Sequence, residues 1–275
     1  MGTYLIAELG STHDGSLGNC LKLIEHCARA GADAVKLQDH RHERIKGSPP
    51  WVTGTDVVES RAAYLQRTSF DTHGWRLIRA TATVCGVDLV VSPFSAAAVA
   101  LLEQVPVDAY KIASGQVTNM AMLRAIGATK RRVFVSSGMT TGEELSAAIG
   151  ELGDCVPMHC TSEYPCAPQH VGLNILARMR AEYPGAGFSD HTMGVAASLA
   201  AVTMGAKVIE RHVAFHRGMY GTDARHSLTV EEFGVFVHEV RSLDRMLESP
   251  VDKSNQVQTP EIQAMRAAFL EREST

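Results

Sequence analysis

The chain has 275 residues, of which 45% are hydrophobic and 20% charged, and its formal net charge is −4. This is an ordinary globular composition, and because no basic run is longer than residues 130–132, we expect no nucleic-acid partner. No apolar run approaches the roughly 20 residues that span a bilayer, and the six cysteines form no Cys-x-x-Cys pair, so we expect reduced thiols in a cytoplasmic protein with no membrane partner.

Short apolar runs alternate with amphipathic stretches from the beginning of the chain to its end. We predict strands at 3–9, 33–38, 87–93, 108–114, 131–137, 155–160, 185–191 and 206–212. We predict helices between and after them at about 18–30, 71–85, 95–105, 119–128, 141–150, 171–182 and 195–205, and from 229 onward. Asp71, Thr141 and Thr229 are suited to cap helices, and Glu232 predicts a capping box with Thr229.

Eight strand–helix units in about 250 residues predict a (β/α)8 TIM barrel. Continuously apolar strands such as "LVVS" and "RVFVSS" are typical of parallel strands covered on both faces. We therefore expect one domain over residues 1–275, ending in a helical tail at about 258–275, with an open doubly wound sheet as the alternative fold.

Two long segments are expected to lie over one end of the barrel. The connection 39–70 is long for a compact domain, and such loops are often lids or substrate-binding elements, here with Arg41, Arg44 and Trp51 as candidate contacts. The segment 217–228, "RGMYGTDARHSL", is predicted to form an irregular loop over the same end.

Polar side chains gather where the predicted strands end, which is where barrels of this kind carry their chemistry. They are Glu8, Lys36, Gln38, Ser92, Lys111, Ser114, Gln116, Ser136, Ser137, His159, Thr161, Ser162, Ser189, His191, Glu210 and His212. Lys36 and Lys111 lie inside apolar strands, where an ammonium group is costly to bury unless an anion meets it. A single such lysine is commonly solvated, but two of them beside clustered hydroxyls predict a site for a phosphate and a carboxylate of one small molecule.

Two histidines end neighbouring predicted strands. The imidazoles of His191 and His212 can converge on one divalent cation such as Mn²⁺, Fe²⁺, Co²⁺ or Zn²⁺, with Asp190 and Glu210 as candidates to orient the rings. A pair of hydrogen-bonded structural histidines is the alternative. Most other histidines, including His13 and His226, are expected at the surface.

Nine segments together resemble the sialic acid synthases, a family of N-acetylneuraminate, pseudaminate and legionaminate synthases. They are "IAELGSTHDGS", "AGADAVKLQ", "VSPFS", "DAYKIASGQVTN", "VSSGMTT", "HCTSEYPCAP", "GFSDHTMG", "GAKVIERHV" and "GTDARHSL". They occur in order over almost the whole chain, so the resemblance covers the barrel.

The resemblance implies a metal-dependent condensation of phosphoenolpyruvate with an aldose-type sugar aldehyde, which releases phosphate and forms a 3-deoxy-2-keto sugar acid. It implies a divalent metal on His191 and His212, with Mn²⁺ expected and Mg²⁺, Co²⁺, Fe²⁺ or Zn²⁺ as alternatives. Tyr164 and Asp223 would face the sugar, and Glu8 would lie near the reacting centre. A homo-oligomer is expected. The residues that match the family's phosphoenolpyruvate site are Lys36, Ser92, Lys111, Ser114, Ser136, Ser162 and Ser189.

Two departures from the family pattern predict a changed acceptor site. Gln116 stands where the family has a catalytic glutamate, and an amide cannot exchange protons. The sequence is also expected to lack the family's small C-terminal antifreeze-like domain. Ser162, where many members carry asparagine, is a smaller change.

Two other functions remain open from the residues. One is a single-domain synthase of the 3-deoxy-octulosonate-phosphate type that uses a phosphorylated aldose, with Arg41, Arg44 and Lys46 as its second basic cluster. The other is a non-catalytic barrel that binds phosphoenolpyruvate or a metal, which only Gln116 favours.

Overall fold

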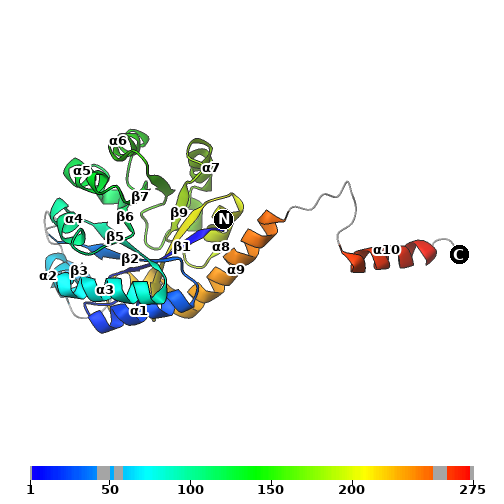
Figure 1. Ribbon diagram of the computed structural model, residues 1–275, viewed down its shortest axis with the longest axis horizontal. Helices are drawn as coiled ribbons and strands as arrows, with labels where there is room; N and C mark the ends of the chain where they lie inside the picture. The colour runs from blue at the N-terminus through cyan, green and yellow to red at the C-terminus, as the bar shows by residue number, and fades with distance from the viewer. Residues whose placement is uncertain (1, 42–49, 53–57, 250–258, 273–275) are drawn as a thin grey trace.

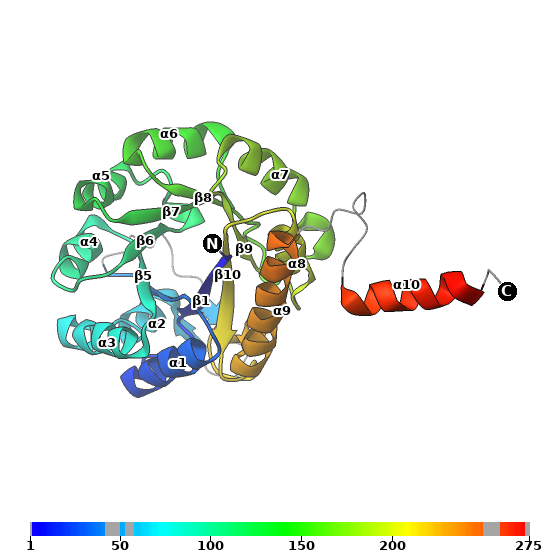
Figure 2. The ribbon, with the colours of Figure 1, turned by 45° about the vertical axis from the view of Figure 1, so that its right-hand side comes forward.

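The structure is a computed structural model and describes residues 2–41, 50–52, 58–249 and 259–272. Parallel strands form a closed barrel, because β1 pairs with β2 on one side and with β10 on the other (Figures 1 and 2). The barrel strands follow in order as β1 (Tyr4–Gly10), β2 (Ala34–Asp39), β5 (Asp88–Pro93), β6 (Ala109–Ile112), β7 (Arg132–Ser136), β8 (Val156–His159), β9 (Gly187–Asp190) and β10 (Val208–Ala214). The predicted (β/α)8 barrel is confirmed.

Helices surround the barrel on its outside (Figure 2). They are α1 (Leu17–Arg29), α3 (Thr72–Cys85), α4 (Ala96–Leu102), α5 (Met120–Thr129), α6 (Gly142–Leu152), α7 (Leu173–Glu182), α8 (Ala196–Thr203) and α9 (Val230–Glu248). Asp71, Thr141 and Thr229 cap α3, α6 and α9, and Thr229 forms a capping box with Glu232, as the sequence pattern predicts. Thr141 forms a second complete capping box, with Glu144.

The long connection after β2 contains its own secondary structure. Strands β3 (Pro50–Val52) and β4 (Val58–Ser60) pair in antiparallel fashion, and α2 (Arg61–Arg67) follows with Ser60 as its N-cap. The segment after β10 carries a short 3₁₀ helix, η3 (Ala224–His226), and the two-residue strand β11 (Leu228–Thr229). A last helix, α10 (Pro260–Arg272), lies apart from the barrel in both views. Within the described ranges, no helix is long and apolar enough to cross a bilayer.

The barrel interior has an apolar layer near the N-terminal ends of the strands, whereas the larger core lies between strands and helices. The interior layer consists of Ile6, Ala34, Val90, Ala109, Phe134, Met158 and Val208. Side chains along a strand alternate between its faces, so the residues two positions further point inward again. Those residues are Glu8, Lys36, Ser92, Lys111, Ser136, Cys160 and Glu210. One strand period therefore separates an apolar floor from a polar layer above it.

Candidate active site

A cavity of about 60 Å³ opens above the apolar floor, at the C-terminal ends of the strands. Its lining comes from the barrel strands and the segments that follow them, and consists of Glu8, Lys36, Gln38, Ser92, Lys111, Ala113, Ser114, Ser136, Tyr164, Ser189, His191, Glu210 and His212. Most of the side chains predicted from the strand ends thus lie around one space.

Two buried lysines share one carboxylate in this cavity. Nζ of Lys111 lies 3.0 Å and 3.1 Å from the two Glu210 carboxylate oxygens, and Nζ of Lys36 lies 3.8 Å from Oε1 of Glu210. Lys36 also contacts Glu8 Oε2 at 2.8 Å. Because both lysines are almost completely buried, these carboxylates are the counter-charges that make their burial tolerable.

The two glutamates differ in their electrostatics. Burial alone raises the pKa of Glu210, but the ammonium groups of Lys111 and Lys36 and a 2.8 Å hydrogen bond from Ser189 outweigh it and bring the pKa to about 2. For Glu8, burial dominates over Lys36 and, with the nearby Glu210 charge, raises the pKa to about 7. Glu210 is therefore a permanent anion, whereas Glu8 can exchange a proton near neutrality.

Hydroxyl groups gather beside the lysines around Gly138. Ser114 Oγ donates to Ser136 Oγ at 3.0 Å and accepts from the Gly138 backbone N–H at 3.1 Å. A Cβ atom at Gly138 would lie 2.3 Å from Ser162 Oγ and 2.4 Å from Cys160 Sγ, so only glycine fits there. Ser162 does not line the cavity directly, but this close approach brings its hydroxyl, which has no partner within the described residues, into the same cluster.

The imidazoles of His191 and His212 lie side by side, with ring centroids 5.6 Å apart. His191 Nδ1 donates to the Thr161 carbonyl at 2.8 Å, which leaves Nε2 as the nitrogen with a free lone pair. Burial, and then the neighbouring His212, lower the pKa of His191 to about 3, and burial also lowers that of His212. His212 Nδ1 is buried and has no hydrogen-bond partner in the described part of the chain.

Two neutral imidazoles of this kind fit a divalent cation, because neutral nitrogen lone pairs are what such metals require. Within the described ranges, no group of three His, Cys, Asp or Glu side chains is arranged to hold a metal. The ring of Tyr164 lies 4.2 Å from that of His191 and 6.1 Å from that of His212, at the rim of the same space.

Asp223 lies just behind this cavity, on the segment that follows β10. Its Oδ2 accepts hydrogen bonds from the backbone N–H and the hydroxyl of Ser11, at 3.0 Å and 2.9 Å. Burial alone raises the pKa of Asp223, but the neighbouring His212 and the Ser11 hydrogen bonds outweigh it and lower the pKa to about 2. A Cβ atom at Gly10 would lie 2.5 Å from Asp223 Oδ2 and 3.4 Å from Glu8 Oε1, so the two carboxylates flank this glycine.

The roles predicted for Asp190 and Glu210 as partners of the histidine rings are wrong. Asp190 accepts from Ser198 and the Thr192 backbone and forms a buried ion pair with Arg211, so it faces away from the cavity. Glu210 points inward and meets the lysines. The two residues occupy opposite faces of their strands, which spacing relative to a histidine does not reveal.

Gln116 does not line the cavity. It lies in the 3₁₀ helix η1 (Ser114–Gln116), and its Oε1 accepts from Asn119 Nδ2 at 2.9 Å. The Arg41 guanidinium already has partners within the protein, because it donates to the Phe70 carbonyl at 2.7 Å and lies 3.8 Å from the Asp39 carboxylate. Arg44 and Lys46 fall outside the described residues, as does the side chain of Trp51.

His13 and His226 are buried rather than exposed, contrary to the expectation. His13 packs on Phe70 with ring centroids 4.7 Å apart. The His226 ring lies 5.2 Å from that of His212 and 5.1 Å from that of Tyr164, because η3 folds back over the cavity. His159 is buried too, but Nε2 donates to the Val171 carbonyl at 2.8 Å and the ring lies outside the cavity lining.

Sequence reasoning missed Cys160, which belongs to the hydroxyl cluster. Its Sγ lies 2.9 Å from Ser136 Oγ and 3.4 Å from Ser114 Oγ. The signal was present in the strand period, because Cys160 stands two residues after Met158 of the apolar floor.

The chain matches proteins of one family along most of its length. The model of the NeuB family matches residues 23–252. An N,N'-diacetyllegionaminic acid synthase of Campylobacter jejuni is 29% identical over 98% of this chain and 84% of its own length. A pseudaminic acid synthase of the same species is 32% identical over 89% and 74%, and a human N-acetylneuraminate-9-phosphate synthase is 28% identical over 90% and 72%.

Solved structures show the same barrel. The N-acetylneuraminic acid synthetase of Leptospira borgpetersenii, solved with citrate, superposes with a TM-score of 0.81 over 98% of this chain and 91% of its own, at 22% identity. The spore coat polysaccharide biosynthesis protein spsE of Bacillus subtilis superposes with a TM-score of 0.74 over 96% and 77%, at 24% identity. The chain therefore belongs to the NeuB family and is an enzyme of the sialic acid synthase type.

Proposed function

We propose that this enzyme condenses phosphoenolpyruvate with the open-chain aldehyde of an aldose and releases phosphate. The observation that carries the proposal is the convergence of Lys36 and Lys111 in one cavity beside the hydroxyl cluster. Phosphoenolpyruvate carries a phosphate and a carboxylate, and two fixed ammonium groups with several hydroxyl donors match that pair of anions. The names of two relatives, an N,N'-diacetyllegionaminic acid synthase and a pseudaminic acid synthase, support the same reaction class.

The bond changes follow from the substrates. C3 of phosphoenolpyruvate forms a bond with the aldehyde carbon, and the aldehyde oxygen takes up a proton. Water adds at C2 and loses a proton, which leaves a hydroxyl and the phosphate on the same carbon. The bond from C2 to the phosphate oxygen then breaks while the hydroxyl proton passes to the departing phosphate, which leaves a 2-keto acid. Lys36 and Lys111 stabilise the negative charge on the phosphate and carboxylate throughout, because they are already in place before the reaction.

Glu8 and Asp223 are the proposed proton-handling groups. Glu8, with a pKa of about 7, can both accept and return a proton at neutral pH, and Gln38 Nε2 holds its Oε1 at 2.7 Å. Asp223 stays ionised and can only accept. Tyr164, which lines the cavity at its rim, would contact the sugar.

His191 and His212 would hold a divalent cation, with Mn²⁺ expected, and Mg²⁺, Co²⁺, Fe²⁺ or Zn²⁺ as alternatives. When bound, such an ion supplies Lewis-acid polarisation of the aldehyde oxygen. The protein keeps both rings neutral by burial and fixes His191 through the Thr161 carbonyl, which prepares the lone pairs before any metal arrives.

We further propose that the acceptor differs from that of the family members named above. Gln116 supports this, because its amide is tied to Asn119 and offers neither charge nor a transferable proton. The reaction is tested by mixing the protein with phosphoenolpyruvate, Mn²⁺ and a panel of aldoses, and measuring released phosphate and the product mass. A product equal to aldose plus phosphoenolpyruvate plus water minus phosphoric acid supports the proposal. Tight phosphoenolpyruvate binding without phosphate release from any aldehyde would instead indicate a non-catalytic binding barrel.

A further inference from the structure

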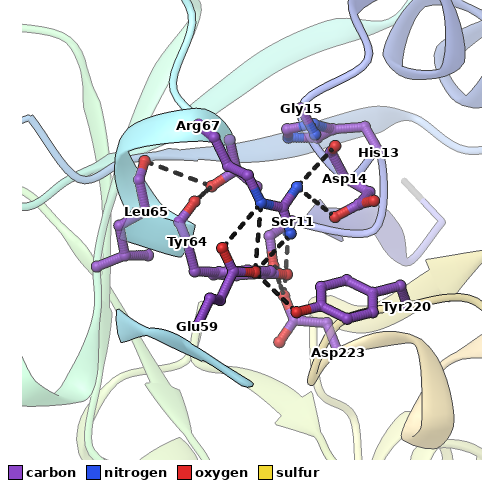
Figure 3. A network of polar contacts seen from close by, with 11 residues as sticks. Ser11, His13, Asp14, Gly15, Glu59, Tyr64, Leu65, Arg67, Tyr220 and Asp223 are labelled. Atoms are coloured by element: carbon purple, nitrogen blue, oxygen red, sulfur yellow. Dashed lines mark hydrogen bonds and ion pairs between the residues drawn. The ribbon is translucent and has the colours of Figure 1, made fainter. Parts of the chain in front are cut away.

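A chain of hydrogen bonds leads from helix α2 to the carboxylate of Asp223 (Figure 3). The Tyr64 hydroxyl donates to Ser11 Oγ at 2.8 Å, and Ser11 Oγ donates to Asp223 Oδ2 at 2.9 Å. Tyr64 is 1% exposed. The three residues come from α2, from the turn after β1 and from the segment after β10, so the chain joins parts of the sequence that are far apart.

The direction of this chain is fixed by its chemistry. A serine hydroxyl has one proton to donate, and a carboxylate such as Asp223 can only accept. Because Tyr64 supplies a proton to the Ser11 oxygen, the Ser11 proton is left to point at Asp223. Without the Tyr64 hydroxyl, the Ser11 hydroxyl is free to rotate. Among the described residues, Asp223 Oδ2 then keeps the backbone N–H of Ser11 as its fixed donor, while Oδ1 still accepts from Thr222 Oγ1 at 3.2 Å.

Arg67 holds Tyr64 in place. Its guanidinium carbon lies 4.9 Å from the centre of the Tyr64 ring and 5.3 Å from that of Tyr220. Its Nη1 donates to Asp14 Oδ1 at 2.7 Å, and its Nη2 donates to Glu59 Oε1 at 2.7 Å. Figure 3 shows these side chains converging on one point between α2 and the two loops. The tyrosine ring is thus clamped, and its hydroxyl has a defined position.

The backbone near Asp223 leaves room for the Tyr64 hydroxyl at Gly221. Gly221 has a φ of +109°, and a Cβ atom there would lie 2.6 Å from the Tyr64 hydroxyl. A side chain at position 221 would therefore push Tyr64 away from Ser11, in addition to straining the backbone. The loop that carries Asp223 and the helix that carries Tyr64 fit each other closely at this point.

We propose that Tyr64 is a positioning residue that orients Asp223 through Ser11. This inference deepens the proposed function, because it takes Asp223 as a proton-handling group of that reaction. The inference assigns a role to helix α2 of the connection 39–70. Tyr64 does not line the cavity, so α2 acts on the reacting centre from outside the cavity. A small displacement of a proton-handling carboxylate lowers turnover more than it lowers substrate binding.

The test is a Tyr64→Phe variant, which keeps the ring and its contact with Arg67 and removes only the hydroxyl. We expect kcat to fall about tenfold, the size that the loss of one orienting hydrogen bond produces. The Kd for phosphoenolpyruvate should stay within about twofold of the wild type, because Tyr64 touches neither lysine. Tyr220→Phe is the matched control: it removes a hydroxyl bonded to Glu59 at 2.9 Å in the same cluster but off the path to Asp223, and it should leave kcat within about twofold.

A double-mutant cycle with Ser11→Ala tests the path itself. If Tyr64 acts through Ser11, Tyr64→Phe has no further effect on kcat in the Ser11→Ala background. Effects that multiply would overturn the inference, as would an unchanged kcat in Tyr64→Phe or an equal loss of phosphoenolpyruvate binding.

Failure of the reaction is a separate outcome. If the wild type releases no phosphate with any aldehyde, the proposed function falls, and the free energy of unfolding becomes the readout. Tyr64→Phe should then destabilise the wild type and Asp223→Asn by different amounts, because the two groups are coupled. Additive effects on unfolding would overturn the orienting link in that case.

Discussion

Lys111 forms a two-pronged ion pair with Glu210 across the barrel, with Nζ 3.0 Å and 3.1 Å from the two carboxylate oxygens. The lysine stands on β6 and the glutamate on β10, and both side chains are almost fully buried. Breaking a buried pair by removing one partner is strongly destabilising, because an uncompensated charge is left behind. In this cavity, an anionic substrate offers a replacement for the lost charge.

Glu210→Gln should therefore lower the melting temperature of the ligand-free protein, and phosphoenolpyruvate should raise it by more than it raises that of the wild type. The measurement is thermal unfolding with and without the ligand. Glu103→Gln is the matched control, because Glu103 pairs with Arg131 near the opposite end of the barrel and has no contact with the cavity. A ligand-induced rise no larger than that of the wild type would contradict the proposed role of Glu210.

His212→Ala should abolish binding of Mn²⁺ and turnover together, since one imidazole alone is a weak ligand set. Metal content after dialysis and the electron paramagnetic resonance of titrated Mn²⁺ measure the binding directly. His238→Ala, at an exposed position of α9, should bind Mn²⁺ as the wild type does. Full metal binding or activity in His212→Ala would remove this residue from the metal site.

Gln116→Glu tests whether the amide is a simple loss relative to the family. If it is, the variant should gain activity with N-acetylmannosamine, because a carboxylate can exchange protons and an amide cannot. Product mass from that acceptor is the readout, with the wild type as reference. Continued inactivity with N-acetylmannosamine, together with turnover of another aldose, would indicate a different acceptor.

His13 should make the protein less stable in mild acid. Burial lowers its pKa to about 4, while the unfolded chain has the ordinary value of 6.5. The unfolded state therefore binds more protons below about pH 6.5, and stability is lost as the pH falls toward 4, by roughly 2 kcal/mol at about pH 5. Urea unfolding measures the free energy of unfolding at about pH 7.5 and at about pH 5. Between these two values, His13→Phe should lose roughly 2 kcal/mol less of this free energy than the wild type does. Equal pH dependence would show that His13 is not held neutral.

Local signals made the fold predictable. Each strand carries its own apolar run, and caps such as Asp71 and Thr141 act within one turn of their helices, so no distant contact is needed to recognise them. The hairpin β3–β4 and helix α2 were not predicted, although Ser60 caps α2. Their place is set by contacts with two remote loops, such as those of Arg67 with Asp14 and of Tyr220 with Glu59.

The site was predictable in composition but not in its pairing. The strand-end rule gathers the lysines, serines and histidines, because parallel strands all end on one side. It does not tell which carboxylate meets which lysine, and so it places Glu210 beside the histidines, whereas the structure places it beside the lysines. His226 is buried and Gln116 does not line the cavity. Both positions depend on how the loops fold back, which sequence spacing alone does not determine. The metal, a homo-oligomer and a cytoplasmic location stay predictions.

Binding of phosphoenolpyruvate by the paired lysines is tested most directly by calorimetric titration of phosphoenolpyruvate into the wild type and into Lys111→Met, with Lys130→Met as the control. Lys130 is exposed at the end of α5, away from the cavity lining. We expect the wild type and the control to bind alike and Lys111→Met to bind at least about a hundredfold more weakly, because a buried charge-assisted contact is lost. Equal affinity in all three proteins, or no binding by the wild type, would contradict the claim that the paired lysines form the site for the doubly anionic substrate.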